Sequence, residues 1–184
     1  MSGESPERGK HAPAGGEVIT HPPVIVARSP EQTARVGEIL GAHADRGRLL
    51  ALWGEMGAGK TCLVQGIARG MGVPEDFFVT SPTFTLINEY PSARGVMLYH
   101  FDLYRLGDAE DLLDLGYEEY WYSDGISAVE WPEIASVLLP ENRIDIYLSI
   151  DDDSTRSIRI EMKGEKMKIL HRELVHHTHI TEGS

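Results

Sequence analysis

Hydrophobic residues are continuous in some stretches of this chain and periodic in others, and the two patterns predict different elements. Residues 48–53, RLLALW, show no alternation, which is typical of a strand that helices cover on both faces. The segment behind this strand predicts a helix that begins at Thr61, because its apolar residues share one helical stripe. These residues are Leu63, Val64, Ile67, Ala68 and Met71. Gly70 and Gly72 are positioned to end the helix.

A strand and a helix are also predicted where order begins, near Val24. Ser29 is a good N-cap for this helix, Pro30 fits its first turn, and Gln32 completes a capping box. The helical spacing then continues through Val36, Ile39, Leu40 and His43.

The second half of the chain is rich in short apolar runs that predict strands. These runs are TFTLINEY, VMLYHFD, ISAVEW, IDIYLSI and SIRIEM. The break PSARG separates the first two as in a hairpin, and the turn DDDST joins the last two as an antiparallel pair.

Three further helices are predicted in this half. Residues 108–121 have a helical composition, and residues 132–139 form a helix that Pro132 begins and Pro140 stops. Residues 165–175 form a last helix before a polar tail.

Length and charge limit the class of protein. At 184 residues we expect one folded domain over 21–175, with a disordered arm over 1–20 and a flexible tail over 176–184. The formal charge of −12 should repel nucleic-acid phosphates. A single cysteine, Cys62, excludes an internal disulfide and suits a reducing compartment. No signal peptide or membrane-spanning run is visible, so a cytoplasmic protein is expected.

Residues 54–61, GEMGAGKT, match the phosphate-binding pattern G-x-x-x-x-G-K-[ST]. Glycines let the backbone curl so that its N–H groups meet phosphate oxygens, Lys60 reaches the outer phosphates, and Thr61 can hold Mg²⁺. No guanine-reading motif follows, which favours ATP. The residues expected to bind the nucleotide are Gly54, Glu55, Met56, Gly57, Ala58, Gly59, Lys60, Thr61 and Cys62.

Mg²⁺ on a triphosphate also needs an acidic residue at the end of a neighbouring strand. Asp102 ends one apolar run and Glu130 ends another, and spacing alone does not choose between them. The hydroxyls of Ser81, Thr83 and Thr85 lie in sequence where nucleotide-sensing switch loops commonly follow. A threonine-rich start of a strand explains them equally well.

Residues 106–142 contain ten acidic residues and no Lys or Arg. A solvated helical face is the simpler interpretation of this acidic stretch, and a docking surface for a basic partner is the functional one. His176, His177 and His179 offer a metal site only weakly, because they lie on a terminal tail.

Four motifs together, GEMGAGKT, SPTFTL, YHFDLYRL and VEWPE, resemble the TsaE family over roughly residues 24–162. That family is the small ATPase of bacterial tRNA threonylcarbamoyladenosine biosynthesis. The resemblance implies an α/β fold, a P-loop NTPase-like three-layer sandwich with a mixed, mostly parallel central sheet. It also implies ATP and Mg²⁺ as cofactors and the TsaB and TsaD proteins as partners, with tRNA contacted only through their complex.

The resemblance assigns roles to the two carboxylates. Thr61 and Glu130 match the family's Mg²⁺ ligands, and Asp102 matches its candidate catalytic carboxylate, which would act with Lys60. Thr83, Thr85 and Trp131 fall in its switch segment.

Cys62 departs from the family pattern, which usually has a second Thr or Ser there, so nucleotide affinity could differ. Two other functions stay open. A small-molecule P-loop kinase would need a basic second pocket, and Arg94 and Arg105 are its sequence candidates. A nucleotide-gated binding module would hydrolyse almost nothing.

Overall fold

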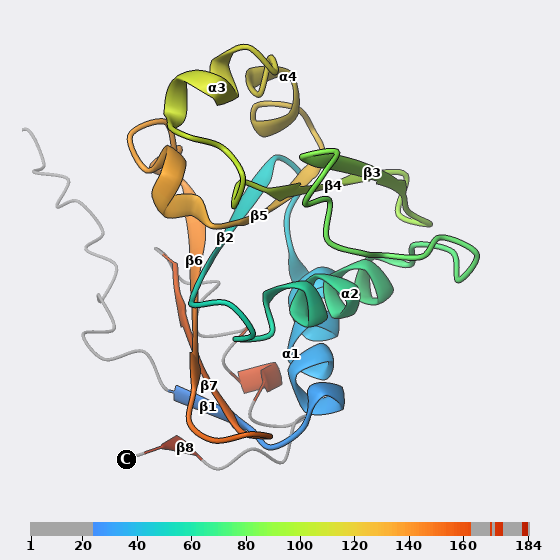
Figure 1. Ribbon diagram of the computed structural model, residues 1–184. Coiled ribbons are helices and arrows are strands. Elements are labelled where there is room, and N and C mark those ends of the chain that lie inside the picture. Colours follow the sequence, from blue (N-terminus) through green and yellow to red (C-terminus); the bar gives the residue numbers. More distant parts are fainter. Residues whose placement is uncertain (1–23, 163–169, 171, 175–181, 184) are drawn as a thin grey trace, which may run out of the picture.

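The computed structural model describes residues 24–162, Leu170, residues 172–174 and the pair Glu182–Gly183 (Figure 1). The predicted N-terminal arm and the three tail histidines lie outside these residues. Of the helix predicted over 165–175, the described residues are Leu170 and 172–174, and they are helical.

One sheet of eight strands forms the middle of the described chain, in the order β3-β4-β5-β2-β6-β7-β1-β8. The strands are β1 (Val24–Ala27), β2 (Arg48–Trp53), β3 (Ile87–Pro91), β4 (Met97–Asp102), β5 (Ile126–Glu130), β6 (Arg143–Ile150), β7 (Arg156–Glu161) and β8 (Glu182–Gly183).

The sheet is mixed, as predicted, but it is not mostly parallel. The four neighbours β4-β5-β2-β6 run parallel through three pairings. The other four pairings of the described strands are antiparallel. Antiparallel pairings outnumber parallel ones partly because short turns join β3 to β4 and β6 to β7, and a short turn can join only antiparallel neighbours. Both hairpins were predicted and are confirmed.

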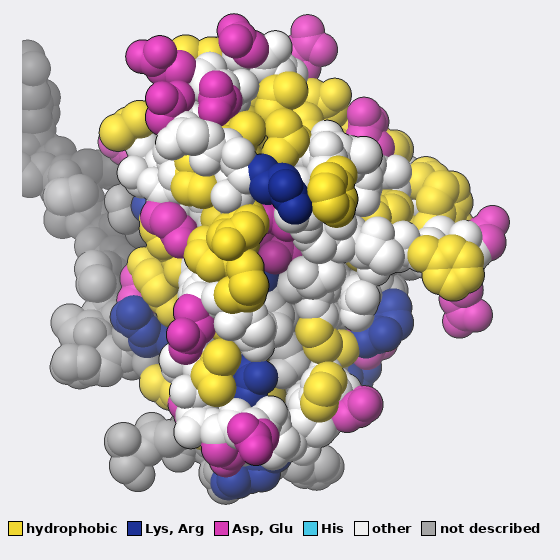
Figure 2. All heavy atoms as spheres, viewed as in Figure 1, with side chains coloured by type: hydrophobic (Ala, Val, Ile, Leu, Met, Phe, Trp, Pro, Cys, Tyr) yellow, Lys and Arg dark blue, Asp and Glu magenta, His cyan; other side chains and the backbone are white. Residues whose placement is uncertain are grey.

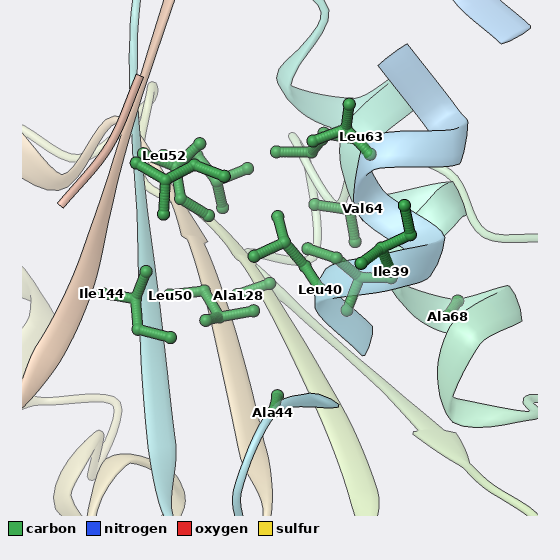
Figure 3. Close-up of a cluster of buried hydrophobic side chains, with 14 of the residues drawn as sticks. Ile39, Leu40, Ala44, Leu50, Leu52, Leu63, Val64, Ala68, Ala128 and Ile144 are labelled. Carbon is green, nitrogen blue, oxygen red and sulfur yellow. The ribbon is translucent and has the colours of Figure 1, made fainter. Parts of the chain in front are cut away.

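Alternate residues of β2 enter two separate hydrophobic clusters, which explains its unbroken apolar run. Leu50 and Leu52 pack towards the helices α1 (Pro30–His43) and α2 (Lys60–Met71), as Figure 3 shows. Leu49 and Ala51 enter the cluster that contains Leu112 and Trp121. Those residues belong to α3 (Ala109–Leu113) and α4 (Glu118–Trp121). The prediction that both faces of this strand are covered is confirmed.

The starts of both long helices follow the sequence signals closely. Ser29 caps α1, and its side chain accepts a hydrogen bond from the backbone N–H of Gln32. The Gln32 side chain in turn accepts from Arg28 N at 2.7 Å, one residue before the position that a capping box uses. Gly72 ends α2, as predicted.

The prediction that Gly70 also ends α2 is wrong, because Gly70 lies inside this helix where it crosses α1. A Cβ atom on Gly70 would lie 1.9 Å from the carbonyl oxygen of Glu38 on α1. A Cβ atom on Gly66 would likewise meet the carbonyl oxygen of Ala34, and Cβ atoms on Gly37 and Gly41 of α1 would meet the backbone of α2. The two backbones therefore touch with no side chain between them.

Two predicted helices are shorter than expected. Residues 108–121 form α3 and α4 as separate short helices, with Gly116 between them at φ 65°. After Pro132 the chain forms a 3₁₀ helix, η1 (Pro132–Ala135), in place of an α-helix to residue 139. Among the described residues, no helix has both the length and the apolar character needed to cross a membrane.

Candidate functional site

The loop of residues 54–59 leaves the end of β2 and turns sharply into α2. Gly59 is the N-cap of α2 and has φ 99°, a left-handed conformation that residues with a side chain rarely adopt. Gly54 has φ 147°, and a Cβ atom there would lie 2.5 Å from the carbonyl oxygen of Leu148 on β6. Arg156 at the start of β7 supports the loop from the same side, because its guanidinium donates to Gly57 O at 3.1 Å. The glycines of the motif are thus required by the backbone path.

Lys60 is buried at the base of this loop, with 4% of its surface exposed. Its ammonium donates hydrogen bonds to the carbonyl oxygens of Gly54 at 2.5 Å and Glu55 at 2.9 Å. It also lies 3.7 Å from the centroid of the Trp131 ring. Burial lowers the pKa of the Lys60 ammonium, and the negative charge of Glu130 is the first influence that opposes this. The cation is held by loop dipoles, in a position to meet an anion bound in the loop.

Thr61, Glu130 and His100 meet at one oxygen atom. The Thr61 hydroxyl donates to Glu130 Oε1 at 2.8 Å, and His100 Nε2 lies 2.9 Å from the same oxygen. Glu130 ends β5 and His100 is two residues from the end of β4. Since these parallel strands end at the same edge of the sheet, their side chains reach the start of α2.

The carboxylate of Asp102 accepts hydrogen bonds from a different set of donors. Its Oδ2 accepts hydrogen bonds from the hydroxyls of Ser81 and, at 2.8 Å, Thr83, and its Oδ1 accepts from Tyr104 N at 3.1 Å. Thr85, the other predicted switch residue, bonds to Asn88 Oδ1 instead. The predicted strand over 83–90 begins only at Ile87, so Thr83 and Thr85 lie in a turn before it.

Trp131 stands at the end of β5 in a strained backbone conformation. Its φ of 60° and ψ of 47° are left-handed, which costs a residue with a side chain about 1–3 kcal/mol. The conformation lets the indole ring lie over Lys60 while it packs against Tyr104, at 4.9 Å between ring centroids. Strain at such a position points to a functional constraint.

These groups surround a cavity of about 520 Å³. Its lining residues are Met56, Gly57, Gly59, Lys60, Thr61, Cys62, Ser81, Thr83, Asp102, Tyr104, Arg105, Glu130 and Trp131. Gly54, Glu55, Ala58 and Thr85 are not among them. The carbonyl oxygens of Gly54 and Glu55 accept hydrogen bonds from Lys60, and the Thr85 hydroxyl donates to Asn88. The structure therefore brings together both candidate carboxylates, the lysine and the threonine that the sequence singled out.

Sequence reasoning missed His100 and Tyr104 in this region, and it singled out Arg105 only as a candidate for the second pocket of a kinase. His100 contacts Glu130, Tyr104 and Arg105 line the cavity, and the Arg105 guanidinium lies 4.3 Å from the Phe84 ring centroid. All three lie within three residues of Asp102, in the motif YHFDLYRL. Alternation along β4 was the available signal for His100, since it shares a strand face with Asp102.

Cys62 also lines the cavity, and it is half-buried. Its thiol lies 3.1 Å from the Pro30 carbonyl oxygen at the start of α1, to which it donates. Burial raises the pKa of this thiol, which keeps it protonated and weakly nucleophilic.

The site fits a magnesium–triphosphate ligand by the chemistry of its donors. No group of three or more His, Cys, Asp or Glu side chains within the described chain could hold a metal by itself. Thr61 and Glu130 nevertheless offer two hard oxygens, and Mg²⁺ usually binds through one or two protein ligands together with phosphates and water. The glycine loop, the start of α2 and Lys60 suit the phosphates.

Of the ten acidic residues in the stretch 106–142, Glu130 lines this cavity and the other nine do not. Figure 2 shows Asp and Glu side chains gathered at the top of the molecule, where α3 and α4 lie in Figure 1. Tyr117 and Trp121 of this stretch are buried in the core and Tyr122 is exposed. The aromatic residues thus serve mainly as core on this side of the sheet.

Comparison with known proteins gives consistent matches. The family model described as "Threonylcarbamoyl adenosine biosynthesis protein TsaE" matches residues 27–158. A "tRNA threonylcarbamoyladenosine biosynthesis protein TsaE" from Treponema pallidum is 41% identical over 135 residues, which are 73% of this chain and 97% of that protein. One of the same name from Bacillus subtilis is 38% identical over 154 residues, covering 83% and 94%. A crystal structure of Bacillus subtilis YdiB superposes with a TM-score of 0.68 and 32% identity, covering 86% of this chain and 99% of that one.

Proposed function

The chain belongs to the TsaE family of tRNA threonylcarbamoyladenosine biosynthesis proteins, and from this membership we propose that it is a Mg²⁺-dependent ATPase serving that modification. One observation carries the proposal: Lys60, Thr61, Asp102 and Glu130 line a single cavity at the start of α2. A lysine, a hydroxyl and two carboxylates around a glycine loop are the parts that ATP hydrolysis requires.

We also propose that the fold is a P-loop NTPase-like three-layer sandwich, and three features of the structure support this. A buried parallel strand, β2, leads through a glycine loop to a helix, and apolar clusters lie on both faces of the sheet. Ligands of open α/β sheets bind beyond the carboxyl ends of the parallel strands, where this cavity lies.

Each side chain has a chemical task in this proposal. The Lys60 ammonium and the backbone amides of the loop stabilise negative charge on the phosphates. Thr61 and Glu130 hold Mg²⁺, which when bound neutralises phosphate charge and fixes the orientation of the nucleotide. Asp102 orients the attacking water, and Ser81 and Thr83 hold its carboxylate in place.

The partner proteins are also proposed from family membership. With a formal charge of −12 the chain would bind tRNA poorly by itself, so we propose that it acts on the complex of TsaB and TsaD, in the cytoplasm. Only that complex would contact tRNA, and ATP turnover here would drive its cycle.

The experiment is to measure phosphate release from ATP and Mg²⁺ with no other small molecule, with and without TsaB and TsaD. Release that increases with the partners, and that Lys60→Ala lowers by about 100-fold or more, supports the ATPase. Arg69→Ala is the matched control, an exposed cation at the other end of α2.

A small-molecule kinase is the alternative, and it predicts no phosphate release without an acceptor. Equal turnover in wild type and Lys60→Ala contradicts both assignments. Absence of hydrolysis with partners present, while nucleotide binding persists, favours a nucleotide-gated binding module.

A further inference from the structure

Both hydrogen-bond contacts of Glu130 with described residues are made by one oxygen, Oε1. One comes from the Thr61 hydroxyl at 2.8 Å, and the other contact is His100 Nε2 at 2.9 Å. Glu130 Oε2 receives none within the described chain. The carboxylate is therefore fixed through one oxygen, and the other oxygen stays available on the wall of the cavity.

His100 is completely buried, and it leaves one polar atom without a partner. Its exposed surface is 0%, and no described residue contacts Nδ1 through a hydrogen bond. A proton on Nδ1 would be a buried donor without an acceptor, which costs more than an unpaired acceptor with a lone pair. The ring proton therefore belongs on Nε2, where it is donated to Glu130.

Space filling does not explain a histidine here. A methionine or leucine would occupy a similar volume in this apolar interior without leaving an unpaired nitrogen. The neighbours confirm that the position is part of the core, since Leu98 and Phe101 on the same strand are also fully buried. What histidine alone provides among similar side chains is a rigid donor that reaches Glu130.

We propose that His100 is a positioning residue that presents Glu130 to a divalent cation. Its Nε2–H holds Oε1, so that Oε2 faces the cation with its direction already set. This inference rests on the proposed function, in which Glu130 holds Mg²⁺ bound with a nucleotide. Partners that fix a ligand in this way typically contribute about 10–100-fold in metal affinity.

The test compares ADP binding with Mg²⁺ and with EDTA by titration calorimetry, in wild type and in His100→Met. We expect His100→Met to reduce the strengthening of ADP binding by Mg²⁺ by about 10-fold or more, while metal-free ADP binding changes less than about twofold. His100→Gln carries an amide donor that can reach the same oxygen, so it should recover most of the effect.

Leu98→Ala is the matched control, since Leu98 lies on the same face of β4, two residues away, and is fully buried. It should weaken folding without a selective loss of the Mg²⁺ effect. An unchanged Mg²⁺ effect in His100→Met overturns the inference. So does an equal loss of metal-free binding, or the same selective loss in Leu98→Ala.

A second measurement needs no variant of uncertain folding. In wild type, ¹H–¹⁵N NMR of the assigned His100 ring should show the proton on Nε2, and a ring protonated at Nδ1 instead would overturn the inference. The proposed function fails separately, if wild type itself shows no effect of Mg²⁺ on ADP binding.

Discussion

The hydroxyl of Thr61 donates a hydrogen bond of 2.8 Å to Glu130 Oε1, and so joins the first turn of α2 to the end of β5. Two oxygens suited to a hard cation are thus held together by the fold before any ligand arrives. The contact gives a physical reason for a threonine after Lys60 and for an acid at the end of β5.

Glu130→Gln keeps the shape of the side chain and an oxygen for Thr61, but it removes the charge. We expect the strengthening of nucleotide binding by Mg²⁺ to fall by at least about 10-fold, because even indirect partners of metal ligands have effects of this size. Metal-free ADP binding should stay the same or improve, since a negative charge near the phosphates is lost. Calorimetric titrations measure both. Glu75→Gln, an exposed acid beyond the other end of α2, is the control and should leave both unchanged.

Thr83→Val removes one of the two hydroxyls that hold Asp102 Oδ2. We expect ATP turnover with TsaB and TsaD present to fall by about 10-fold, because a freed carboxylate no longer holds the reacting geometry. Thr80→Val, at an exposed threonine of the same loop, should change turnover less than twofold. Phosphate-release assays decide, and equal rates in the two variants would remove the role given to Thr83.

Trp131 offers a direct test of backbone strain. With φ at 60°, Trp131→Ala keeps an unfavourable conformation that Trp131→Gly relieves, so the glycine variant should be the more stable by about 1 kcal/mol. At an ordinary loop position the order is reversed, because glycine gains entropy in the unfolded chain. Urea unfolding of both variants measures the difference. A more stable alanine variant would mean that the left-handed conformation is absent.

Gly70→Ala sets two effects against each other. Helix propensity alone predicts a gain of about 1 kcal/mol. The new Cβ would lie 1.9 Å from the Glu38 carbonyl oxygen, and relieving this clash costs typically about 1–3 kcal/mol or more. We therefore expect a net loss of stability in chemical unfolding. Gly95→Ala should lose less stability, because nothing lies within 4 Å of its new atom and only the left-handed φ of 66° opposes a side chain there. A stabilised Gly70→Ala would show that the helices can move apart freely.

Lys60 gives a prediction about pH. Its folded-state pKa is lowered by burial, so between that value and 10.5 the unfolded chain binds more protons than the folded one at this site. Folding stability from this group therefore rises with pH in that window, by at most about 1.4 kcal/mol per pH unit. The folding stability of Lys60→Met relative to wild type should be highest at neutral pH and should decrease towards pH 10.5. Unfolding curves across this range check the sign, and a difference that does not vary with pH would contradict it.

The sequence predicted the parts of the fold that depend on local signals. Ser29 starts α1, Gly72 ends α2, and the unbroken run RLLALW is a strand buried on both faces. Gly70 was misread because a glycine near a helix end looks the same whether it terminates the helix or admits a neighbouring backbone. Only the position of α1 distinguishes the two.

The site shows the same limit. Asp102 and Glu130 were recognised as strand-end acids, but spacing could not tell which one contacts Thr61, because that depends on strand order in the sheet. Alternation along β4 could have placed His100 on the same strand face as Asp102, but its contact with Glu130 is visible only in the structure. Thr85 matched the pattern of a switch segment, but its hydroxyl donates to Asn88. The backbone of the turn sets this direction, and residue type alone does not predict it.

The glycine contact between α1 and α2 has a mechanical consequence. Helices separated by side chains can slide by repacking them, whereas backbones in direct contact have nothing to repack. We therefore expect α1 and α2 to move together as one unit. A displacement of the glycine loop at the start of α2 would therefore move α1 as well.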